Sequence, residues 1–192
     1  MKAAVTCLSA LIVTAGMYAA GSPPVPPADT FQVDPVHSSM MFRVKHMGVA
    51  NFYGRFNSIA GSFSLDDDAS KNSFQVEIQT GSVDTAQKKR DDHLKSPDFF
   101  NAVQFPKITF KSVEVKKSGD AFDVTGDLSL HGVTKAVTAK VTRTGTGNMR
   151  GRQIAGVEAV LTIKRSDFGM TFSLDSLGDE VYIVISLEGG KQ

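Results

Sequence analysis

The sequence predicts an all-β fold, an antiparallel barrel of seven or eight strands. From Phe31 onward, apolar residues recur at every second position, as they do in strands with one buried face. Turn-forming residues such as Asp66–Asp68 and Lys117–Asp120 separate these runs, and short connections between strands are typical of antiparallel hairpins. Closing the sheet into a barrel removes its exposed edges, although a sandwich with a helix fits the same pattern.

Each expected strand places its apolar residues on one parity. Met40, Phe42 and Val44, for example, alternate with the run Met41, Arg43 and Lys45. Between residues 108 and 115 the apolar parity switches, which predicts a β-bulge near Ser112. Turns are expected at His131–Gly132 and over residues 144–151. The alternating runs cover residues 40–45, 74–79, 108–115, 122–130, 133–141, 157–163 and 181–187.

Residues 85–100 interrupt the alternation and are predicted to be a short helical insertion. The charged residues 88–92 suit a solvated face, Leu94 is expected to pack inward, and Pro97 ends the first helical piece. The pair Phe99–Phe100 follows at once, so two large apolar side chains are expected beside a mouth of the barrel.

The length and composition suit one globular domain, and the charge pattern argues against nucleic-acid binding. The 192 residues are enough to bury a sizeable core, and 41% of them are hydrophobic. The formal net charge is +1, with both signs mixed along the chain, whereas nucleic-acid binding needs a basic face or stripe. The 13 Phe residues and the lack of Trp suit a wall that contacts hydrocarbon, and equally an ordinary core.

Residues 1–21 are predicted to be a signal peptide. Lys2 is followed by an apolar run over 3–15 and by small residues at positions 19–22, as a signal-peptidase site requires. An uncleaved membrane anchor is the competing interpretation, because residues 3–20 carry no charge. We therefore expect export to the periplasm.

The remaining chain is expected to form a linker and one folded domain. Several prolines within residues 22–30 predict a stiff linker, and the domain is expected to span residues 31–189. Cys7 is the only cysteine and lies inside the predicted signal peptide, so the mature protein would have no thiol. Thiolate catalysis and a cysteine-ligated metal are then excluded.

The sequence offers no catalytic constellation. His37 and His46 would face opposite sides of a regular strand, and no HxH, HExxH or GxSxG motif occurs. Adjacent Asp91 and Asp92 would point about 100° apart on a helix, so they would not share a site. We therefore predict no enzyme activity, no metal site and no cofactor. An enzyme whose site the fold assembles from the histidines is an alternative of a different class.

Several longer pieces occur in a fixed order along the domain: His37–His46, Gly54–Phe56, Asp92–Asn101, Pro106–Phe110, Gly126–Lys135, Arg165–Gly169 and Gly178–Val181. On these pieces, the chain resembles the YceI-like polyisoprenoid-binding proteins from Phe31 to about Gly189. The resemblance implies an eight-stranded lipocalin-like barrel, typically periplasmic, that holds an isoprenoid or similar amphiphile and has no enzyme activity. Asn101 departs from the family pattern, in which an acidic residue is common there; we expect this to affect a local cap more than binding.

The predicted function is therefore that of a non-catalytic periplasmic carrier for a polyisoprenoid or another long-chain amphiphile, a quinone included. The alternative is an interaction module with a filled barrel that binds an envelope or membrane redox partner. Transient membrane contact and a homodimer stay open, and no nucleic-acid partner is expected.

The predicted ligand-binding residues share the inward parity or lie at the mouth. Each of them is also open to the simpler interpretation of ordinary core. His37, Arg43, His46 and Arg165 are the polar candidates for a headgroup. The apolar candidates are Met40, Phe42, Phe56, Phe63, Phe74, Leu94, Phe99, Phe100, Ile108, Phe110, Phe122, Leu128, Leu161, Met170, Phe172 and Ile183.

Overall fold

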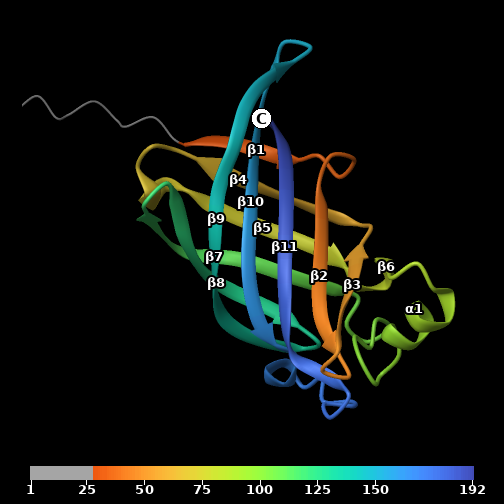
Figure 1. Ribbon diagram of the computed structural model, residues 1–192. Helices are drawn as coiled ribbons and strands as arrows, with labels where there is room; N and C mark the ends of the chain where they lie inside the picture. Colours follow the sequence, from red (N-terminus) through yellow and green to blue (C-terminus); the bar gives the residue numbers. More distant parts are fainter. Residues whose placement is uncertain (1–27) are drawn as a thin grey trace, which may run out of the picture.

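The computed structural model describes residues 28–192 and shows a closed barrel of antiparallel strands (Figure 1). The predicted signal peptide and most of the predicted linker lie outside the described residues. The strands are β1 (Asp29–Val33), β2 (Ser39–His46), β3 (Ala50–Phe56), β4 (Ile59–Leu65), β5 (Ser73–Gln79), β6 (Val83–Asp84), β7 (Lys107–Ser118), β8 (Ala121–Leu130), β9 (Val133–Met149), β10 (Arg152–Lys164) and β11 (Leu177–Lys191). The helical elements are α1 (Lys88–Leu94) and the 3₁₀ turns η1 (Ala69–Lys71), η2 (Thr80–Ser82) and η3 (Arg165–Phe168).

The predicted closed eight-stranded barrel is confirmed, because the strand pairing returns to its starting point. β1 pairs with β4 on one side and with β11, the last strand in the sequence, on the other. Three pairs of consecutive strands each form one interrupted arm of the barrel: β1 with β2, β3 with β4, and β5 with β6. The first two arms lie side by side, because β1 pairs with β4 and β2 pairs with β3. With each interrupted arm counted once, the 11 strands form eight arms, and the sandwich alternative is wrong.

The strands of the near wall cross those of the far wall at a steep angle. In Figure 1, β9, β10, β11 and β2 run side by side at the front, and β4, β5, β7 and β8 cross behind them. The predicted alternation holds along the wall: Met40, Phe42 and Val44 of β2 are buried inside the barrel, whereas Met41 and Lys45 are exposed. The apolar core therefore fills the space between the two walls.

Irregular positions in the strands help the sheet to close. The predicted bulge near Ser112 is confirmed, because the register between β7 and β8 shifts between Ser112 and Glu114. A second shift lies in β10, between Gly156 and Val157. Bulges increase the local twist of a strand, which a closed barrel of this size needs.

Three local predictions are wrong in their bounds. The turn expected over 144–151 is confined to Arg150–Gly151, because β9 and β10 stay paired up to Met149 and form a hairpin that projects beyond the barrel (Figure 1). The helix expected over 85–100 covers only α1, with turns leading to Pro97 and beyond. His37 lies in the turn before β2 and not on a strand, since the arm is broken between β1 and β2.

The two ends of the barrel are built differently. At one end, here called the mouth, the β2–β3 turn lies beside the loop after η3, and the Met47 amide donates to the Ser176 carbonyl at 2.7 Å. At the other end, Phe63 stacks between Phe31 and Phe74, with ring centroids 5.4 and 6.4 Å apart. No helix within residues 28–192 combines the length and hydrophobicity needed to cross a bilayer.

Candidate functional site

Two apolar chambers lie inside the barrel. Their volumes are about 90 Å³ for the mouth-side chamber and about 60 Å³ for the deep chamber. Both expose only apolar atoms to the cavity. Each is several times the roughly 10–15 Å³ that one water molecule needs, but apolar walls give water no hydrogen-bond partners. The interior is therefore suited to hydrocarbon.

The chambers meet at a ring of four side chains, which we call the waist. Met40, Ile108, Leu128 and Ile183 line both chambers, and they come from β2, β7, β8 and β11. Met40 is unbranched and can change rotamer at low cost, so the waist is adaptable. Together the chambers form an elongated apolar space along the barrel.

Three Phe rings close one side of the mouth-side chamber. Phe100, which comes from the insertion after α1, meets Phe56 with ring centroids 5.3 Å apart and Phe42 at 6.5 Å. Phe42 and Phe56 lie 5.8 Å apart on neighbouring strands. The predicted placement of Phe100 beside a barrel mouth is thus explained by an aromatic cluster between the insertion and the wall.

A third cavity, here called the vestibule, opens outside the mouth-side chamber and has a volume of about 440 Å³. It shares five lining residues with the chamber: Phe42, Val44, Leu94, Phe99 and Leu177. Its polar side chains are His46, Arg90, His93, Ser173 and Ser176, whereas Arg165 lines the mouth-side chamber without exposing a polar atom to it. The path from solvent to the deep chamber therefore passes from a mixed surface to a purely apolar one.

Most of the predicted apolar candidates lie in these linings. Phe74, Phe110 and Leu161 line the deep chamber, and Phe172 lines the vestibule. Phe63 and Phe122 line none of the three cavities: Phe63 belongs to the stack at the closed end, and Phe122 lies under the Arg143 guanidinium, 5.3 Å from its ring centroid. The remaining apolar candidates line the mouth-side chamber: Met40, Phe42, Phe56, Leu94, Phe99, Phe100, Ile108, Leu128, Met170 and Ile183.

Several lining residues were missed by the sequence prediction. Val44, Leu130, Ile163 and Val181 line the mouth-side chamber and share the inward parity of their strands, so alternation could have found them. Leu177 lies at the mouth end of β11, where only the fold brings it to the chamber.

Arg165 lies at the mouth but is committed to the fold. It is 3% exposed, and its guanidinium donates to the carbonyls of four residues at 2.7–3.0 Å. Burial lowers the pKa of this guanidinium, and nearby Asp179 opposes that shift. With four of its five N–H donors bound to backbone carbonyls, Arg165 holds the mouth loop in place. Its acceptors are Met170, Phe172, Leu177 and Gly178.

Arg43 faces away from the cavities. It lies on the outer parity of β2, and its guanidinium carbon is 4.7 Å from the centroid of the Tyr182 ring. Two headgroup candidates line the cavities: Arg165 lines the mouth-side chamber, and His46 lines the vestibule.

The sequence profile of the YceI-like domain matches residues 31–189. The chain belongs to the YceI-like family. The resemblance seen in the sequence pieces is thereby confirmed.

Relatives of this YceI-like chain include proteins named UPF0312. One from Pseudomonas paraeruginosa is 41% identical over 189 residues, which cover 96% of this chain and 97% of the relative. One from Yersinia pestis is 41% identical over 186 residues, which cover 95% of this chain and 93% of the relative. The likeness therefore extends over nearly the full length of both relatives.

Solved structures share the fold. BcnA of Burkholderia cenocepacia matches with a TM-score of 0.75 and 28% identity, covering 81% of this chain and 98% of BcnA. A Campylobacter jejuni YceI protein matches with a TM-score of 0.69 and 28% identity, covering 77% of this chain and 90% of that protein. A polyisoprenoid-binding domain from Saccharophagus degradans has a TM-score of 0.67 at 16% identity, covering 86% of this chain and 99% of that domain, and so shows the fold alone.

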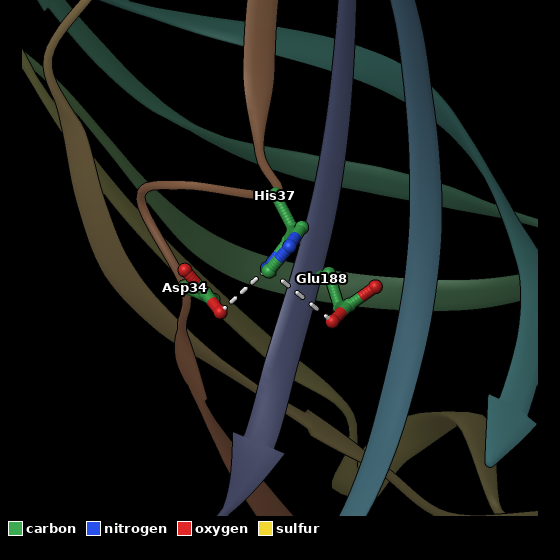
Figure 2. Close-up of side chains that lie close together, drawn as sticks. All are labelled: Asp34, His37 and Glu188. Atoms are coloured by element: carbon green, nitrogen blue, oxygen red, sulfur yellow. Dashed lines mark hydrogen bonds and ion pairs between the residues drawn. The ribbon is translucent and has the colours of Figure 1, made fainter. Parts of the chain in front are cut away.

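His37 lies away from the cavities of this YceI-like domain, in a cluster with Asp34 and Glu188 (Figure 2). Its Nδ1 is 2.9 Å from Asp34 Oδ2 and 3.9 Å from Glu188 Oε1. The hydrogen bond to Asp34 raises the pKa of His37, and the same bond lowers the pKa of Asp34. The cluster joins the break between β1 and β2 to β11, which suggests a structural role; the absence of a metal site stays a prediction.

Proposed function

We propose that this YceI-like protein is a non-catalytic carrier that holds the apolar tail of a polyisoprenoid or similar long-chain amphiphile inside the barrel. The observation that carries the proposal is the pair of chambers joined at the waist, which expose only apolar atoms. An isoprenoid or quinone tail is long, slender and free of polar groups, so it matches this space in shape and chemistry.

The physics of burial favours tight binding of such a tail. Transfer of hydrocarbon from water is worth about 0.8 kcal/mol per CH₂ before the costs of association. A tail of a few isoprene units therefore supplies enough free energy for a stable complex. Apolar walls select by length and shape more than by chemistry, so several native lipids would compete for the same chambers.

The relatives support a binding role. The structure from Saccharophagus degradans is described as a polyisoprenoid-binding domain, and it shares the barrel fold. The interaction-module alternative needs a filled interior, and the two chambers weigh against it. Serines and histidines both line the vestibule, but no hydrogen bond joins a serine to a histidine among the described residues, which favours a carrier over an enzyme.

We further propose that the carrier works in the periplasm after removal of a signal peptide. Lys2, the apolar run after it and the small residues at 19–22 support this location. Intact-mass measurement should give a mature chain that begins between Ala20 and Pro23, in the soluble periplasmic fraction. Retention of Met1 on membrane-bound protein would favour the uncleaved anchor.

Mass spectrometry of organic extracts from natively purified protein tests the carrier function. We expect a long-chain isoprenoid or related amphiphile at close to one molecule per chain. Phe110→Ala, in the deep chamber, should change the amount or chain length of that lipid. Val113→Ala is the matched control, because Val113 is on the same strand but 73% exposed.

Loss of lipid should not be confused with loss of fold. Phe→Ala costs roughly 3–5 kcal/mol in a solid core, and less where the ring faces a cavity. Thermal denaturation of both variants separates the two effects. The carrier proposal fails if no lipid is ever extracted and every chamber variant loses stability as a solid core would.

A further inference from the structure

Large apolar side chains gather on the two loops at the mouth of the barrel. Met47 and Val49, in the β2–β3 turn, are 60% and 83% exposed, and Phe172 and Leu174, in the loop before β11, are 44% and 42% exposed. These four residues, here called the rim, are four of the ten large hydrophobic residues that are exposed within residues 28–192. Single exposed apolar residues are ordinary, but a group of them around one opening indicates a contact surface.

The two loops are joined into one surface. The Met47 amide donates to the Ser176 carbonyl at 2.7 Å, and His46 pairs with Leu177 in the ladder between β2 and β11. Inside the second loop, the amides of Ser176 and Leu177 donate to the Ser173 carbonyl at 3.2 and 2.8 Å. Figure 1 shows both loops together at the lower end of the barrel. The rim is therefore part of the folded barrel and has a defined position.

Met47 has a backbone conformation that methionine rarely adopts. Its φ is 51° and that of Gly48 is 67°, and the Val49 amide closes this turn by donating to the His46 carbonyl at 3.0 Å. Tight turns with a positive φ at both central positions favour Asn, Asp or Gly. Neither the backbone nor contact with water favours a methionine here, whereas contact with an apolar partner does.

The rim borders the path to the interior. Phe172 lines the vestibule, and its ring meets those of His93 and Phe99 edge to face, with centroids 5.4 and 5.3 Å away. Phe99 also lines the mouth-side chamber. Apolar surface therefore continues from the rim through the vestibule to the chambers.

The size of the rim favours a lipid bilayer over a second copy of this chain. At about 200 Å² for each fully exposed residue, the four residues expose roughly 450 Å². A stable protein interface buries about 800 Å² on each partner. Binding to a bilayer increases with the apolar area that is inserted, so a patch of this size gives a weak and reversible contact.

We propose that the rim inserts into the apolar region of a phospholipid bilayer and holds the mouth of the barrel against it. A tail then passes between the bilayer and the chambers without crossing water. The proposal rests on the carrier function above and gives the route by which the carrier is loaded. Passage through water would expose every CH₂ group of the tail, and that cost increases with tail length.

A pair of tryptophan variants tests the insertion. The chain has no tryptophan, so one introduced indole reports its own surroundings. Val49→Trp places it on the rim, and Val36→Trp is the matched control, because Val36 is equally exposed but lies in the turn before β2, at the opposite end of that strand.

Uncharged vesicles of phosphatidylcholine are the probe, so that attraction to anionic lipids plays no part. We expect the emission of Val49→Trp to shift to the blue when vesicles are added, and to be quenched by brominated acyl chains. Val36→Trp should show neither change. No response at position 49, or equal responses at both positions, would overturn the docking of the rim.

Polar substitutions test the same turn without adding apolar surface. In a Met47→Asn, Val49→Thr double variant, the partition coefficient measured by vesicle flotation should fall about tenfold. Thermal stability should not fall, because Asn is favoured at a positive φ. The matched control is Met149→Asn, Val36→Thr, which removes the same residue types from exposed positions away from the mouth and should leave flotation unchanged. An equal change in the two double variants would contradict the proposal.

Transfer kinetics separate the docking from the carrier function. The rate at which geranylgeraniol moves from the vesicles to the delipidated protein should rise in proportion to protein concentration, as transfer by collision requires. In the Met47→Asn, Val49→Thr variant this rate should be about tenfold lower, with the equilibrium affinity for geranylgeraniol unchanged. A rate independent of protein concentration would indicate passage through water and would overturn the docking, while the carrier function would stand. No uptake at equilibrium would overturn the carrier function as well.

Sedimentation velocity tests the competing occupant. We expect the unmodified protein and the Met47→Asn, Val49→Thr variant to have the same oligomeric state. A dimer that this variant converts to a monomer would assign the rim to a second copy of the chain and would overturn its assignment to a bilayer.

Discussion

The ring of Phe42 lies against the backbone of Gly54, its partner across the β2–β3 ladder. A Cβ placed on Gly54 would be 2.8 and 2.9 Å from Cε1 and Cε2 of this ring, and nearer still to Cζ. Glycine at this position gives Phe42 room over β3. The mouth-side chamber keeps its space as a result.

Gly54→Ala should therefore push the Phe42 ring toward the chamber and weaken the binding of geranylgeraniol. We expect a loss of about tenfold in affinity, which corresponds to roughly 1.4 kcal/mol of binding free energy. Calorimetric titration measures the change. Gly145→Ala is the control, because a Cβ there meets no atom within 4 Å. Unchanged affinity in a folded Gly54→Ala protein would show that Phe42 does not shape the ligand space.

Ala159→Phe should shorten the longest tail that the barrel accepts. Ala159 lines the deep chamber, so a ring there fills the space beyond the waist. Geranylgeraniol should bind more weakly, while the shorter geraniol, which fits in the mouth-side chamber, should bind as before. The exposed position Ala60→Phe on β4 serves as the control. Overpacking costs about 1–3 kcal/mol, so thermal denaturation has to accompany the titrations. Equal weakening for both alcohols would contradict the selection of tails by length in the deep chamber.

Arg165→Met should destabilise the protein by about 3 kcal/mol, because several buried carbonyls lose a charged donor. Urea denaturation measures the loss, and Arg43→Met, on the outer face, should change stability by much less. A small effect at Arg165 would mean that water replaces the guanidinium in the mouth loop.

The His37–Asp34 pair should make stability depend on pH. Because the pKa of His37 is raised in the folded state, its contribution is complete below the unfolded value of about 6.5 and is lost as the pH rises through the folded value. Because the pKa of Asp34 is lowered, its contribution exists above about pH 4 and is lost as the pH falls further. The pair therefore stabilises the fold between these limits.

The melting temperature of His37→Gln should fall below that of the unmodified protein between about pH 4.5 and 6.5, and the two should converge as the pH rises through the raised folded pKa of His37. Val36→Ala, an exposed substitution in the same turn that removes no titratable group, should show no such window. A constant difference at every pH would mean that His37 acts by packing alone.

The sequence predicted the wall better than the ends of the barrel. Alternation identifies which side of a strand faces inward, so Met40, Phe110 and Leu161 were correctly assigned to the interior. It carries no information on height along the barrel axis. Phe63 and Phe122 have the inward parity of their strands but lie outside the chambers for that reason.

The polar residues were harder to place because their surroundings come from distant parts of the chain. The acceptors of Arg165 belong to a loop whose path alternation does not describe. Arg90 and His93 line the vestibule only because the insertion that contains α1 folds back over the mouth. His37 was wrongly assigned to a strand, because alternation did not show the break between β1 and β2 in which it lies.

The barrel is closed by its first and last strands, since Phe31 pairs with Lys191. During synthesis, β11 follows every other strand, so the wall stays open until that strand is made. Folding of such a topology is slow, because contacts between distant residues carry a large entropic cost of loop closure. Until then the apolar faces and the unpaired edges of β10 and β2 are exposed to aggregation. Under the proposed carrier function, the same interval would give a lipid its widest access to the interior, through the gap that β11 later closes.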